Sequence, residues 1–114
     1  MKNISPANIF HHGNAVPDEE ELFETLASGD VVIERIVSRG QITPETEWYN
    51  QEKDEWVILL TGEARILFEN SGEIALKPGD YLLIPARERH RVTYTSKSPE
   101  CLWLAIHGHI HDKK

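Results

Sequence analysis

Residues 55–90 read EWVILLTGEARILFENSGEIALKPGDYLLIPARERH, and this stretch decides the fold. It opens on a nearly continuous apolar run at 55–61, and apolar and polar side chains then alternate over 64–68. Alternation with a period of two is typical of a strand that buries one face. Turn residues separate the apolar segments at 70–72 and 77–80. The stretch therefore predicts four short strands joined by tight turns.

The flanking residues extend the same pattern. Residues 31–37 are rich in β-branched side chains, residues 90–95 alternate, and residues 102–107 form a last apolar segment. Many short strands separated by turns favour a sandwich or barrel over an α/β fold. A jelly roll suits them because it protects the edges of short strands. We expect an all-β, jelly-roll β-barrel.

One short helix is predicted ahead of the barrel, over residues 17–26. Proline stands at its start, acidic residues fill its first turn, and Gly29 lies just beyond its end. Its apolar residues would pack against the barrel. The predicted organisation is an N-terminal segment with this helix (1–30), the barrel (31–107) and a C-terminal tail (108–114).

Composition and net charge limit the kinds of molecule that this chain is expected to bind. A chain of 114 residues forms one domain, and its net charge of -7 argues against nucleic acid or an anionic membrane as a partner. Cys101 is the only cysteine, so no disulfide forms within the chain. Residues 1–17 lack the apolar segment of a secretion signal. These features predict a cytoplasmic protein.

Two segments resemble the paired motifs of the cupin superfamily. Glu55 and Gly62 have the spacing of its first motif, and Pro78-Gly79-Asp80, Pro85 and His90 follow the order of its second. The resemblance spans residues 31–107 and is closest to small, stand-alone bacterial cupins. It implies a jelly-roll barrel that often binds a divalent metal. The His-x-His pair that precedes the glutamate in the family is absent here: either Tyr49 and Gln51 or Trp48 and Asn50 occupy those positions.

The candidate metal ligands are Glu55 and His90, each at the start of a predicted strand. Strand parity turns both side chains toward the barrel interior. A carboxylate and an imidazole can together hold Zn, Fe, Mn or Ni. Gln51 is the expected third, neutral ligand, and His107 is an optional one at the end of the last strand. The alternative is a hydrogen-bonded Glu55–His90 ion pair without metal.

Two functions follow from this site. The first is a metal-dependent enzyme that acts on a small polar metabolite through a weak Glu/His site. The second is a non-catalytic cupin that binds or senses a small ligand without metal, using Tyr49 and Tyr94 beside Gln51. Arg87, Arg89 and Arg91 are read as solvated charge rather than as an anion clamp.

Assembly is predicted from strands that are apolar on both faces. Residues 55–61 and 102–107 carry large apolar side chains on either face, so both faces need cover. One face lines the barrel. Either the N-terminal helix or a second subunit covers the other, and we expect a homodimer.

Overall fold

The computed structural model describes residues 4–12 and 20–113, and within these ranges the fold is all-β. Eight strands are described there. They are β1 (Leu22–Ser28), β2 (Val32–Ser38), β3 (Asp54–Thr61), β4 (Ala64–Phe68), β5 (Gly72–Leu76), β6 (Tyr81–Ile84), β7 (His90–Thr95) and β8 (Cys101–Gly108). The predicted jelly-roll β-barrel is confirmed.

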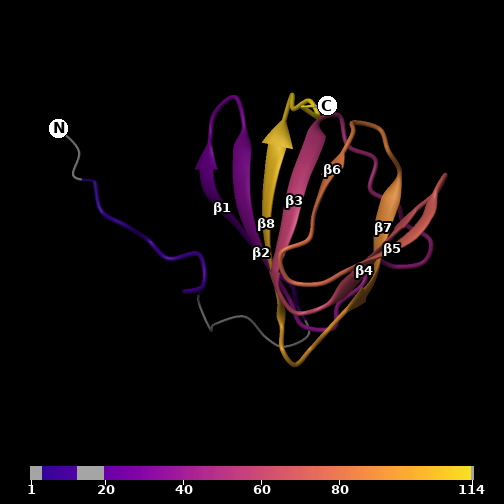
Figure 1. Ribbon diagram of the computed structural model, residues 1–114, viewed down its shortest axis with the longest axis horizontal. Coiled ribbons are helices and arrows are strands. Elements are labelled where there is room, and N and C mark those ends of the chain that lie inside the picture. The colour runs from indigo at the N-terminus through magenta and orange to yellow at the C-terminus, as the bar shows by residue number, and fades with distance from the viewer. Residues whose placement is uncertain (1–3, 13–19, 114) are drawn as a thin grey trace.

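The strands form two antiparallel sheets that face each other (Figure 1). The larger sheet has the order β1-β2-β8-β3-β6, and the smaller has the order β5-β4-β7. Neighbours in the larger sheet are far apart in sequence, since β8 lies between β2 and β3. This topology brings side chains from distant segments into one interior.

The predicted helix over residues 17–26 is wrong. Residues 22–28 form strand β1, which pairs with β2 in the register Leu22↔Val37; residues 17–19 lie outside the described part of the chain. The acidic and apolar residues of this segment fit a helix face, and they do not alternate as in a half-buried strand. Backbone pairing with β2 decides between the two, because tertiary context overrides local propensity.

The apolar core lies between the two sheets. Its apolar members come mainly from the inward faces of β3, β4 and β8, and Cys101 is fully buried among them. The buried set is Val57, Leu59, Ala64, Ile66, Phe68, Leu76, Ile84, Cys101, Trp103 and Ala105. Several of these side chains also line a cavity, so the core forms part of the wall of that cavity.

The outer face of the larger sheet is covered in part by an extended segment, where a helix was expected. Arg35 of β2 is buried on this face and donates hydrogen bonds to the backbone carbonyls of Asn8, Ile9 and His11. The same guanidinium makes a bidentate pair with Glu24 of β1, at 2.9 and 3.1 Å. Farther along the sheet, five apolar side chains remain partly exposed: Trp56, Ile58, Leu60, Leu104 and Ile106.

Within the described ranges, no helix has the length and apolar character needed to cross a membrane.

Candidate functional site

The candidate site is the open end of the barrel, where a cavity of about 90 Å³ opens to the surface. Its lining comes from both sheets and from the residues just before β1 and β3. The polar members of the lining are Glu21, Glu34, Ser38, Tyr49, Gln51, Glu55, His90 and His107. Five of the six residues predicted to form the site therefore lie in one cavity.

Glu55 and His90 form the centre of this cavity. They are 8% and 4% exposed, and Glu55 Oε1 lies 3.8 Å from His90 Nε2. That distance is too long for a hydrogen bond. His90 Nδ1 lies 2.8 Å from the carbonyl oxygen of Glu88. Because a carbonyl can only accept, Nδ1 carries the proton, and in the neutral ring the lone pair of Nε2 faces Glu55.

Two aromatic rings fix the orientation of the His90 imidazole. Tyr49 stacks on it with ring centroids 5.5 Å apart, and Phe68 lies at 5.7 Å on a tilted plane. Tyr49 and His90 also exchange two backbone hydrogen bonds, of 2.8 and 3.2 Å. These two hydrogen bonds connect the loop before β3 to the start of β7 and place Tyr49 at the mouth of the cavity.

Gln51 and His107 approach Glu55 from different sides. The Gln51 side chain lies close enough to the Glu55 carboxyl to lower its pKa. His107 is the cross-strand partner of Glu55 in the β3–β8 pairing, and its Nε2 lies 3.3 Å from Glu34 Oε1. The cavity therefore holds two imidazole–carboxylate pairs.

Sequence reasoning missed Glu21 and Glu34. Glu34 shares the inward face of β2 with Ile36 and Ser38, a parity that could have revealed it. Ser38 Oγ donates to Glu21 Oε2 over 2.6 Å. Glu21 was missed as a site residue because the residues around it were predicted to form a helix.

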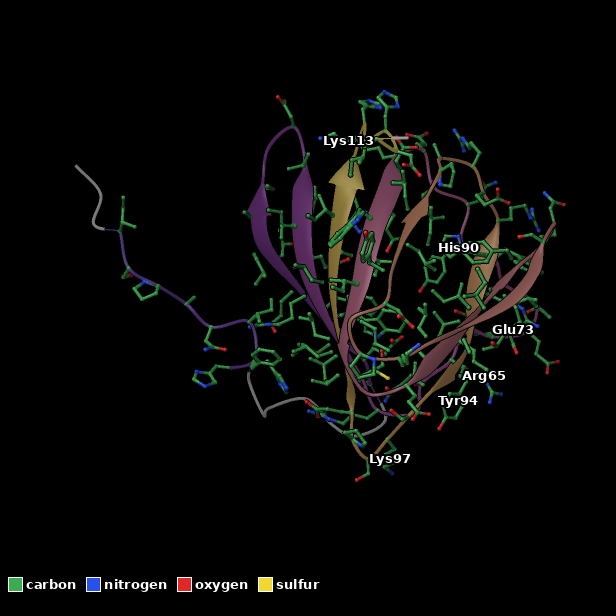
Figure 2. All side chains as sticks on the ribbon, in the orientation of Figure 1. Arg65, Glu73, His90, Tyr94, Lys97 and Lys113 are labelled. Carbon is green, nitrogen blue, oxygen red and sulfur yellow. The ribbon has the colours of Figure 1, made fainter. Side chains whose placement is uncertain are left out.

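Tyr94 does not reach the cavity, which corrects the expectation that it binds a ligand beside His90. The β4–β7 register slips between Arg65 and Ile66, so that Ile66 pairs with Val92 while Arg65 pairs with Tyr94. One extra residue in β7 turns Tyr94 outward, because a bulge breaks the alternation. Tyr94 is 41% exposed and packs under the Arg65 guanidinium, away from His90 (Figure 2).

Burial and neighbouring charges shift two pKa values in the cavity. Burial raises the pKa of the Glu55 carboxyl, and the nearby Glu34 charge raises it further, against the opposing effects of His107, His90 and Gln51. Burial also raises the pKa of Tyr49, helped by the charges of Glu21, Glu55 and Glu34. Both shifts have burial as their largest cause.

Replacing Glu55 with glutamine is expected to stabilise the metal-free protein at neutral pH. The folded pKa of Glu55 lies above the unfolded value of about 4.3, so the free energy of unfolding falls as the pH rises through that window and stays lower above it. Glu55→Gln removes this loss. We expect the Tm of chelator-treated protein to rise by about 3 °C at pH 7.5, the shift that about 0.5 kcal/mol gives in a domain of this size.

That gain should vanish near pH 3, well below the unfolded value of about 4.3, where Glu55 is protonated in both states. Glu45→Gln is the matched control, because Glu45 is exposed on a loop outside the cavity. A Glu55→Gln protein that melts lower than the parent at pH 7.5 would contradict the assignment of a buried, destabilising carboxylate.

Comparison with known proteins agrees with this architecture. The model of the cupin domain family matches residues 34–107. A solved structure from Ralstonia eutropha JMP134, a protein provisionally assigned as a mannose-6-phosphate isomerase, is 36% identical with a TM-score of 0.84, and the match covers 94% of this chain and all of that one. A cupin superfamily protein from Desulfitobacterium hafniense DCB-2 is 25% identical with a TM-score of 0.69, over 83% of both chains.

A more distant match shows the fold alone. An RmlC-like cupin from Desulfovibrio desulfuricans is 17% identical with a TM-score of 0.72, over 95% of this chain and all of that one. The search of curated proteins finds no match. The family match covers more than half of the chain, and the two sheets enclose one interior cavity. This chain belongs to the cupin domain family.

Proposed function

We propose that the barrel cavity binds a small polar metabolite, and that Glu55, His90 and Gln51 hold a divalent metal ion there. The observation that carries the proposal is the 3.8 Å between Glu55 Oε1 and His90 Nε2, with Nδ1 of the same ring engaged by the Glu88 carbonyl. A metal-bound histidine usually donates its other ring nitrogen in this way. The first candidate function is a metal-dependent enzyme.

The donor atoms fit a metal ion in spacing and in kind. Two metal–ligand bonds of about 2.1 Å each can span up to about 4.2 Å, which accommodates the Glu55–His90 separation. One carboxylate, one imidazole and one amide oxygen suit Zn, Fe, Mn or Ni. A bound ion would polarise an oxygen of the ligand. His107 is a further candidate ligand, if it is released from Glu34.

A metal-free binding or sensing cupin is the second candidate, and one observation favours it. The described residues contain no group of three or more His, Cys, Asp or Glu side chains placed to hold one ion, and His107 Nε2 lies 3.3 Å from Glu34 instead. In this case Tyr49, Gln51 and His90 would contact the ligand directly.

Elemental analysis of protein purified without added metal separates the two candidates. We expect about one transition-metal ion per chain in the parent and at least a tenfold loss in His90→Ala, because this change removes the imidazole ligand. His109→Ala is the control, since His109 is exposed in the C-terminal tail and is no part of the cavity lining. Equal metal content in the parent and in His90→Ala would overturn metal binding at this site.

We further propose that a homodimer covers the exposed part of the outer sheet face. The support is the row of partly exposed apolar side chains on β3 and β8, which residues 4–12 and 20–30 leave open. Placing a charge there with Trp56→Glu is expected to weaken the association at least tenfold. Light scattering at 1–100 μM (roughly the range in which small homodimers dissociate) should show a dimer for the parent, and a monomer for the parent would contradict it.

A further inference from the structure

The outer face of the larger sheet is buried at one end and open at the other. Val37 of β2 and its cross-strand partner Leu102 of β8 lie at the buried end, and both are almost fully covered. The open end carries four partly exposed apolar side chains, which we call the open stripe: Trp56, Ile58, Leu104 and Ile106. They form two cross-strand pairs between β3 and β8, so their side chains are contiguous.

Residues 4–10, which we call the arm, start on the same face and run away from their own barrel. The Arg35 guanidinium holds the carbonyls of Asn8 and Ile9, which anchors the base of the arm on β2. The arm then extends beyond β1, on the side of the larger sheet away from the smaller sheet (Figure 1). Ile4 is 100% exposed and Phe10 is 55% exposed. The arm therefore projects from the outer face and gives its own barrel little apolar contact.

We propose that the arm of each chain packs on the open stripe of a second copy, so that a two-fold dimer exchanges its two arms. This proposal rests on the homodimer proposed above and names the element of each chain that covers the other. The arm and the open stripe belong to the same face of one chain. A second copy that packs on this face by two-fold symmetry therefore meets the first arm with its own stripe, and the reverse.

The arm and the open stripe match in chemistry. Residues 4–10 read ISPANIF and contain no charged side chain, although 27% of the whole chain is charged. The stripe is likewise uncharged. Packing one on the other buries apolar surface from both chains and leaves no charge without a partner. Ile4, exposed to water in the single chain, would gain most from this burial.

The arm is also long enough and stiff enough to cross the stripe. Pro6 fixes its own φ and biases Ser5 toward an extended conformation, so little freedom is lost on docking. Seven extended residues span up to about 24 Å. The three neighbouring strands β8, β3 and β6 are together only about 10 Å across. One arm can therefore cover the full width of the stripe.

Ile4→Ser tests the arm without disturbing the fold of the single chain. Because Ile4 is fully exposed there, its replacement removes no packing from the monomer. We expect the dimer dissociation constant, measured by sedimentation equilibrium, to rise about tenfold or more as the buried apolar contact is lost. Ile42→Ser is the matched control, since Ile42 is half exposed and precedes Thr43, which bonds to β7 of the smaller sheet. It should leave the dissociation constant unchanged.

A mixed dimer assigns the contact to the partner chain. Chains with a nitroxide attached through Ser5→Cys are mixed with isotope-labelled chains that carry no nitroxide, so that NMR relaxation reports contacts between chains alone. Cys101 is fully buried, which protects it from the label. We expect strong broadening of the Ile58 and Leu104 methyl signals, and none for Ile74 on β5 of the smaller sheet.

The outcomes separate the arm exchange from the homodimer itself. A dimer whose dissociation constant is the same in the parent and in Ile4→Ser would overturn the arm exchange alone. So would broadening of Ile58 and Leu104 that appears only when nitroxide and isotope share one chain, because the arm would then fold onto its own barrel. A parent that stays monomeric throughout the concentration range used for light scattering would overturn the homodimer, and the arm exchange with it.

Discussion

Gly62→Ala is expected to lower the free energy of unfolding by about 3 kcal/mol or more, the combined cost of backbone strain and overpacking. Gly62 follows strand β3 with a φ of 85°, a conformation that side chains with a Cβ rarely adopt. A Cβ at this position would lie 2.8 Å from Cys101 Sγ and from the Glu100 carbonyl oxygen. These are buried or backbone atoms, so they cannot move aside cheaply.

Gly72→Ala is the matched control for this prediction. Gly72 has a similar φ of 96°, but a Cβ there would meet no atom within 4 Å. Its replacement should therefore cost only the strain, about 1–2 kcal/mol. Urea unfolding of both variants measures the two costs at constant m. Equal losses would show that the contact with Cys101 carries no energy, contrary to the structure.

Local patterns in the sequence predicted most of the strands. They failed for residues 17–26 and for the direction of the Tyr94 side chain. Alternation and turn residues placed seven of the eight described strands, because each signal lies within a few neighbouring residues. The helix at 17–26 failed because Leu22, Phe23 and Leu26 fit one face of a helix, and only the long-range pairing of β1 with β2 makes this segment a strand. Tyr94 was misplaced because the β4–β7 bulge leaves no mark in the sequence.

The candidate site shows the same contrast between local signals, which could be read from the sequence, and long-range contacts, which could not. Glu55 and His90 could be predicted because motif spacing and strand parity both point to them. Parity could have placed Glu34 on the inward face of β2, but the partners of Glu34 and Glu21 in the site could not be predicted, because those contacts depend on long-range pairing. Glu34 approaches His107 only because β2 pairs with β8, and Glu21 approaches Ser38 only because the residues before β1 lie beside the end of β2. The set of charged side chains in the cavity therefore depends on which strands pair, and local sequence patterns do not reveal it.

Trp103→Ala is expected to lower the free energy of unfolding by about 4 kcal/mol, within the range for a buried tryptophan. Trp103 is 4% exposed, packs in the apolar core and lines the cavity. Its removal leaves a void and also ends the hydrogen bond from Nε1 to Ser38 Oγ. Trp103→Phe should cost less, because it keeps most of the packing and loses only the hydrogen bond and part of the ring.

Trp56→Ala is the control, because Trp56 lies on the opposite face of the same sheet, partly exposed and packed on Tyr81. In the monomer its replacement should cost less than half as much as Trp103→Ala, since less apolar surface returns to water. Denaturant unfolding at low and high protein concentration measures both costs. A Trp56→Ala cost that rises with concentration would mean that a second chain buries Trp56, as the homodimer requires. A cost equal to that of Trp103→Ala even in the monomer would contradict the assignment of Trp103, and not Trp56, to the core.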